Sequence, residues 1–103
     1  MAWFGSVSGS QVDNFAKSLV QELARHYPPA YEQGEGKADR KVFSVLDSLF
    51  GKARDFRNLH NLGVYKKARL ANTFRWEMQE LGYSAKFTEF ATEGLVVSMT
   101  QKG

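Results

Sequence analysis

The side chains able to act as acids, bases or nucleophiles are few in this sequence and do not form a catalytic pattern. The sequence has no cysteine and two histidines, His26 and His60. Neither histidine has a second histidine or a carboxylate at the spacing of a metal site, and no serine lies in a nucleophile-elbow pattern. The sequence therefore predicts no catalytic residue, no metal site and no cofactor, in a protein that is not an enzyme.

One glycine-rich segment, Gly34-Glu35-Gly36-Lys37, invites comparison with a phosphate-binding loop. That motif requires a glycine five positions before the Gly-Lys pair and a serine or threonine directly after the lysine. This sequence has Tyr31 and Ala38 at those two positions. The segment is therefore interpreted as part of a surface loop over residues 28–38, rich in proline and glycine, and not as a nucleotide site.

A different group of side chains is suited to binding. Tyr65, Arg69, Asn72 and Trp76 recur at spacings of four, three and four residues, which places them along one ridge of a helix. Arginine and asparagine form paired hydrogen bonds with base edges, and tyrosine and tryptophan stack on bases or contact the sugar and phosphate. The basic residues expected to contact phosphates beside this ridge are Lys52, Arg54, Arg57, Lys66 and Lys67.

The distribution of charge supports the same segment. The whole sequence carries a net charge of +3, but residues 52–75 contain seven basic residues and one acidic residue, a balance of +6. Residues 1–51 sum to −1 and residues 76–103 to −2. An anionic partner is therefore expected at residues 52–75, and the leading prediction is a non-catalytic binding module for DNA or RNA whose affinity falls with salt.

Two other interpretations of these residues stay open. In the first, Tyr65 and Trp76 pack beneath another element as core residues, and Arg69 reaches the surface from the edge. In the second, the protein is a protein-interaction or assembly module, a homodimer or a subunit of a complex, that uses a C-terminal sheet edge and the exposed aromatics Trp3, Phe4 and Trp76. The exposure of Trp76 discriminates between a binding ridge and a core residue.

The ridge must be positioned by helices, and three are predicted. Apolar residues at spacings of three and four predict a first helix from a cap at Ser10 to the Pro28-Pro29 pair. A second helix is predicted from Asp39 to about His60. After the break at residues 61–63, a third is predicted over residues 64–81 and closed by Gly82. Its core stripe is expected to consist of Val64, Leu70, Ala71, Phe74, Met78 and Leu81.

The last segment has a different composition, rich in Phe, Val and Thr. Residues 85–91 and 95–100 are predicted strands, joined by a turn at Thr92-Glu93-Gly94. A short helix over residues 84–93 is the alternative, because Phe87 and Phe90 lie three residues apart and would fall on opposite faces of a strand. The predicted fold class is α+β, three helices followed by a C-terminal β-hairpin, which is the element order of a winged helix.

Length and composition limit the number of domains and the location that the sequence allows. The 103 residues suit one domain over 1–103, with residues 1–9 expected to be flexible and the core held by packing alone because there is no disulfide. No run of about 18 apolar residues is present, so no membrane segment is expected. The first ten residues do not resemble a secretory signal, and a cytoplasmic location is expected.

Overall fold

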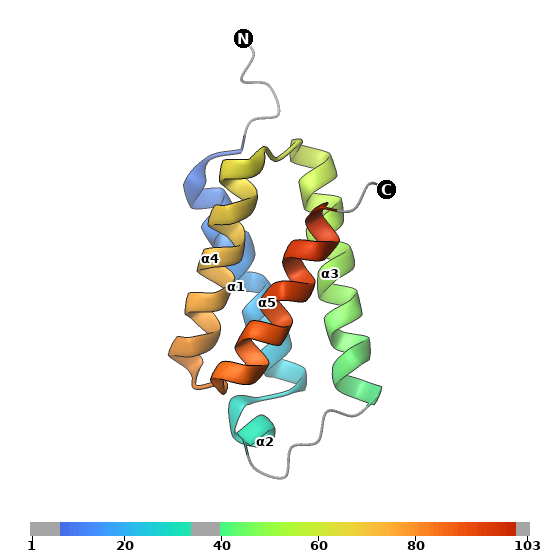
Figure 1. The fold of residues 1–103 in the computed structure, drawn as a ribbon, viewed down its shortest axis with the longest axis vertical. Coiled ribbons are helices and arrows are strands. Elements are labelled where there is room, and N and C mark those ends of the chain that lie inside the picture. The colour runs from blue at the N-terminus through green and yellow to red at the C-terminus, as the bar shows by residue number, and fades with distance from the viewer. Residues whose placement is uncertain (1–6, 34–39, 101–103) are drawn as a thin grey trace.

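The computed structural model describes residues 7–33 and 40–100, and its elements in these ranges are all helices. No strand occurs in the described ranges, so the predicted α+β class, the C-terminal β-hairpin and the winged-helix arrangement are wrong. The helices, shown in Figure 1, are α1 (Gly9–His26), α2 (Pro29–Gln33), α3 (Arg40–His60), α4 (Val64–Leu81) and α5 (Ala85–Thr100).

The four long helices form a bundle. Helix α1 packs beside α4, α5 packs against both α4 and α3, and α3 completes the ring by contacting α1. Helices α3 and α4 therefore lie on opposite sides of the bundle, and residues 61–63 cross its end between them (Figure 1). Asn61 adopts a left-handed backbone conformation in this crossing, with φ of 52°, and Leu62 is buried beneath it. This arrangement determines which predicted site residues share a surface.

The core follows the apolar spacing of the helices. Each long helix directs one stripe of side chains inward, at the three- and four-residue intervals of an amphipathic helix. Val64 and Leu81, predicted in the core stripe of α4, are instead 80% and 46% exposed, because they are the first and last residues of that helix. The largest fully buried side chains are Val12, Leu19, Val20, Leu23, Val42, Leu49, Leu70, Phe74, Met78, Thr88, Leu95 and Met99.

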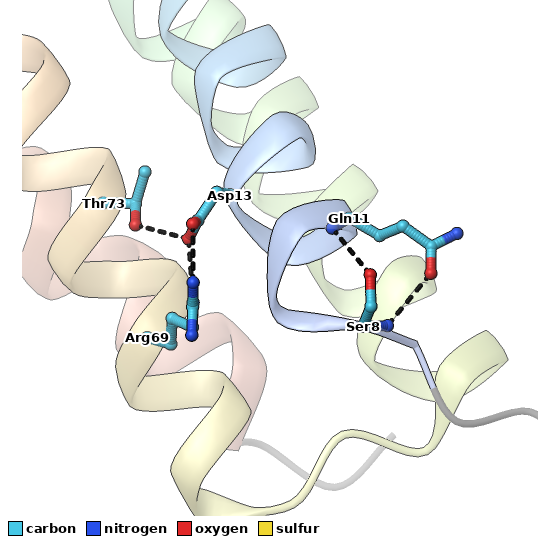
Figure 2. Close-up of polar contacts among 5 residues, drawn as sticks. All are labelled: Ser8, Gln11, Asp13, Arg69 and Thr73. Atoms are coloured by element: carbon cyan, nitrogen blue, oxygen red, sulfur yellow. Dashed lines mark hydrogen bonds and ion pairs between the residues drawn. The ribbon is translucent and has the colours of Figure 1, made fainter. Parts of the chain in front are cut away.

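The start of α1 is fixed by a capping box at Ser8, two residues before the predicted cap. The Ser8 hydroxyl accepts a hydrogen bond from the Gln11 backbone N–H at 3.2 Å, and the Gln11 side-chain oxygen accepts one from the Ser8 N–H at 2.9 Å (Figure 2). Val7 and Val12, the two positions of a hydrophobic staple, are both buried. The chain therefore enters α1 at a set angle at Val7, and residues 1–6 lie outside the described ranges.

The predicted ends of two helices are confirmed. Helix α1 ends at His26, directly before Tyr27 and Pro28. Helix α4 spans Val64–Leu81 and is closed by Gly82, whose φ of 103° is readily adopted only by glycine. The predicted second helix is also present as α3, but its predicted cap, Asp39, lies outside the described residues.

The segment predicted as a hairpin is the single helix α5. Its buried residues Ala91, Leu95 and Met99 lie four apart along one helical face, whereas Val97, predicted on the same strand face as Leu95 and Met99, is 51% exposed. The alternative of a helix at residues 84–93 agrees with the structure from Ala85 onward, and the helix continues to Thr100. Packing against α3 and α4 has overridden the strand preference of Val, Thr and Phe.

Part of the predicted surface loop forms helix α2, which attaches to the start of α5. The Glu32 carboxylate accepts hydrogen bonds from the Ser84 backbone N–H at 2.9 Å and from its hydroxyl at 2.7 Å. Beside this contact, the buried Tyr83 hydroxyl donates to the Tyr27 carbonyl at 2.6 Å, and burial raises the pKa of Tyr83. These contacts join the end of α1 to the start of α5. Residues 34–39 of the predicted loop lie outside the described ranges.

Candidate binding surface

Helix α4 has one face in the core and an opposite face in solvent. We define its outer face as Tyr65, Arg69, Asn72, Trp76 and Gln79. Tyr65 is 73% exposed and Trp76 55% exposed, and Asn72 and Gln79 are also exposed. The interpretation of Tyr65 and Trp76 as core residues is therefore wrong. The predicted ridge lies on the surface of the described structure.

Arg69, in the middle of the outer face, is held by an aspartate from α1. Its Nε donates to Asp13 Oδ1 at 3.0 Å and its Nη2 to Asp13 Oδ2 at 2.9 Å, and the Thr73 hydroxyl donates to Oδ1 at 2.9 Å (Figure 2). The guanidinium also lies against Gly9, where a Cβ atom would come within 2.6 Å of Nη1. The paired donors that were predicted to read a base edge are therefore already bonded to Asp13.

The Asp13 contact makes the stability of the fold dependent on pH. Hydrogen bonding from Arg69 lowers the pKa of Asp13, and Thr73 and the positive charges of Arg69 and Lys17 lower it further, against an opposing effect of burial. The folded pKa therefore lies below the unfolded value of about 3.9, so the contact stabilises the fold above that pH and is lost as pH falls through the folded pKa.

We accordingly expect Asp13→Asn to be less stable than the parent protein at neutral pH and to match it at strongly acidic pH. Urea-induced unfolding followed by circular dichroism at about pH 7, at about pH 2.5 and at still lower pH checks both points, since the contribution of the contact is complete at pH 7 and shrinks as pH falls below the unfolded pKa. Asp55→Asn is the control, because Asp55 is exposed on α3 and has no ion pair among the described residues. An equal deficit of Asp13→Asn at every pH would contradict this assignment.

Salt bridges join three bases of the central segment to acids from other helices. Besides Arg69, the Lys52 Nζ atom lies 2.6 Å from Glu22 Oε1 on α1. The Arg75 Nη2 atom lies 2.9 Å from Glu89 Oε2 on α5. Each of the three acids comes from outside residues 52–75. The balance of +6 along the sequence is thus partly neutralised on the folded surface.

The structure brings together only some of the nine predicted site residues. Tyr65, Arg69, Asn72 and Trp76 share the outer face of α4, and Lys66 lies at its edge in the first turn. Lys67, in the same turn, lies on the side of α4 that faces α5 and lines a small pocket with Val96 and Met99. The three remaining bases belong to α3, on the opposite side of the bundle (Figure 1): Lys52, Arg54 and Arg57.

Two shallow grooves border the outer face. The groove toward α1 has a volume of about 470 Å³ and is lined by Trp76 and by acidic and basic side chains. The groove toward α5 has a volume of about 790 Å³ and includes the half-exposed Val96. In the described ranges no three His, Asp or Glu side chains are close enough to hold a metal ion. The absence of catalytic activity stays a prediction, and the surface is suited to contact rather than to enclosing a small molecule.

Fold and surface together define a four-helix bundle with an exposed aromatic ridge on one helix. No family model matches the chain, and comparison with curated proteins and with solved structures finds no match either. None of the helices in residues 7–33 and 40–100 has both the length and the apolar character needed to cross a membrane.

Proposed function

We propose that the protein is a binding module whose partner is another protein, docked on the outer face of α4. The observation that carries this proposal is the exposure of Tyr65 and Trp76 on a helix whose opposite face buries Leu70, Phe74 and Met78. Tyrosine, tryptophan and arginine are the side chains most enriched among residues that dominate protein–protein binding energy. All three are present here, and the contact with Asp13 holds the arginine in place.

Charge favours a protein partner over a nucleic acid. Arg69 is already bonded to Asp13, and Glu77 and Glu80 on the same helix would repel phosphates. The α3 bases belong to the helix on the opposite side of the bundle from α4. Mixed charge around exposed aromatics is characteristic of a protein interface with a polar rim. DNA or RNA binding stays a prediction, and it is tested below as a separate outcome.

Photo-crosslinking at the outer face tests the proposal. A benzophenone amino acid replaces Asn72, which is exposed between Tyr65 and Trp76, and the protein is irradiated in the cells that produce it. We expect covalent adducts that are digested by protease and resist nuclease. The control position is Ser48, exposed on α3, where no adduct of the same mass is expected.

Trp76→Ala in the Asn72 crosslinking variant is expected to abolish the adduct, since it removes the largest exposed side chain of the face. Adducts that contain nucleic acid would replace the proposal with the nucleic-acid prediction. No adduct at Asn72, or an equal yield of the same adduct at Ser48, would exclude the outer face of α4 as the docking site.

A further inference from the structure

The charges of α4 run against the dipole of the helix. A helix favours acidic residues at its start and basic residues at its end. Helices α1 and α3 have no acid in the first turn either, but they follow the rule at their C-terminal ends, with Arg25 and His26, and Arg57 and His60, in their last turns. Helix α4 has no acid in its first turn, which contains Lys66, and no base in its last turn, which contains Glu80. Its own field therefore destabilises these charges.

Lys66, Glu77 and Glu80 are also without ion-pair partners among the described residues, unlike Lys52, Arg69 and Arg75. Glu77 and Glu80 follow Lys66 by eleven and fourteen residues, which are close to three and four helical turns. The three charges therefore line one edge of α4 beside the outer face, basic at one end and acidic at the other. A partner with the reverse order of charges would complement this edge.

A second copy of the same helix in the opposite direction has that order. We propose that two copies of the protein associate through their α4 outer faces, antiparallel, about a two-fold axis close to Asn72. This inference rests on the proposed function and names the partner. Lys66 of each copy then lies beside Glu77 and Glu80 of the other. Because the two-fold axis repeats this contact, the unfavourable charges at both ends of each α4 gain partners of opposite sign.

The position of Asn72 fits such an axis. Tyr65 and Gln79 lie seven residues on either side of it, so antiparallel packing about Asn72 places the first turn of one helix beside the last turn of the other. The Asn72 side chains of the two copies can hydrogen-bond to each other, which sets the register. A parallel arrangement would place Lys66 against Lys66, and is therefore disfavoured.

The dimer is expected to be weak. An 18-residue helix is about 27 Å long, so one helix face and its borders form an interface at the small end of the specific range. We therefore expect a dissociation constant in the micromolar range, on the order of 10–100 µM. Sedimentation velocity of the full chain from about 5 to 500 µM covers both species across that range.

Charge reversal gives a sharp test. Lys66→Glu alone and Glu77→Lys/Glu80→Lys alone each place like charges at both ends of the interface, and each variant is expected to dimerise at least tenfold more weakly than the parent. In an equimolar mixture every contact is again between opposite charges, so a heterodimer of parent-like affinity is expected. Asp55→Lys, on the exposed surface of α3, is the control and should leave the parent dimer unchanged.

Loss of dimer cannot be attributed to misfolding, because both reversals align the charges with the helix dipole. The melting temperature of each variant, measured by circular dichroism at a concentration where the parent is monomeric, is expected to equal or exceed that of the parent. A parent protein monomeric at 500 µM, or a mixture of variants that does not associate, would overturn the inference. If Asn72 crosslinks to a different protein in that case, the proposed function stands and only the identity of the partner changes.

Discussion

Phe74→Ala is expected to lower the free energy of unfolding by about 3–5 kcal/mol, the largest effect of any substitution considered. Phe74 is fully buried and is the largest of the completely buried side chains, on the inner face of α4. Its truncation removes the transfer free energy of the phenyl ring and leaves a cavity that rigid neighbouring helices fill only in part. Urea-induced unfolding followed by circular dichroism measures the loss.

Trp76→Ala is the matched variant, two residues along the same helix on the outer face. Trp76 is 55% exposed, so its removal is expected to change the free energy of unfolding by less than about 1 kcal/mol. Both variants are compared at a concentration where the protein is monomeric, because dimer formation stabilises the fold by mass action. A Trp76→Ala cost similar to that of Phe74→Ala would show that Trp76 belongs to the core and cannot dock a partner.

The opposite exposure of Phe74 and Trp76 was predictable from the sequence. Helical periodicity assigned Phe74 to the core stripe and Trp76 to a ridge pointing away from it, and both assignments hold in the structure. Local signals also located the helix ends, because Pro28 cannot continue a helix and Gly82 supplies the left-handed cap. These features depend on nearby residues, and a sequence contains that information directly.

Helix α5 was missed because its sequence lacks a clean helical pattern. Its apolar residues occupy more than one face, so Val96 and Val97 are partly exposed next to the buried Leu95. β-branched residues and a central glycine then favour a hairpin when neighbours in the fold are unknown. The decisive contacts come from α3 and α4, and no local signal reveals them.

The chemistry of the candidate surface was also only partly predictable. The ridge on α4 follows from spacing, but the partner of Arg69 is Asp13, 56 residues earlier in the chain. Asp13 lies in the first predicted helix, and no local pattern in the sequence places it opposite Arg69. A charge balance counted along the sequence therefore overstated the positive character of the folded surface. The charge of the folded surface depends on ion pairs between helices, and these pairs depend on which helices are neighbours in the bundle.

The sequence predicts a turn at Gly94, whereas in the structure this glycine lies within α5 and lets α5 approach α3. A Cβ atom at Gly94 would lie 2.5 Å from Cζ of Phe50 on α3, a separation that requires the ring or the helix to move. Gly94→Ala gains up to about 1 kcal/mol of helix propensity but incurs an overpacking cost of about 1–3 kcal/mol. We expect a net loss of about 1–2 kcal/mol in the free energy of unfolding.

Gly51→Ala is expected to change the free energy of unfolding in the opposite direction. Gly51 lies in the interior of α3, and a Cβ atom there would meet nothing within 4 Å, so the helix propensity of alanine is gained without a clash. The variant is expected to be more stable than the parent by up to about 1 kcal/mol. The same unfolding measurement therefore separates a packing glycine from a glycine that only weakens its helix.

A double-mutant cycle shows whether the ring of Phe50 is the obstacle at Gly94. In a Phe50→Ala background the space occupied by the phenyl ring is free, so Gly94→Ala is expected to become neutral or stabilising. The sign of the Gly94→Ala effect thus depends on one residue of α3, 44 positions earlier in the chain. If Gly94→Ala instead stabilised the parent protein as much as Gly51→Ala does, α5 would not approach α3 this closely. Gly94 would then only lower the helix propensity of α5, as Gly51 does in α3, and no close contact between helices would require a glycine there.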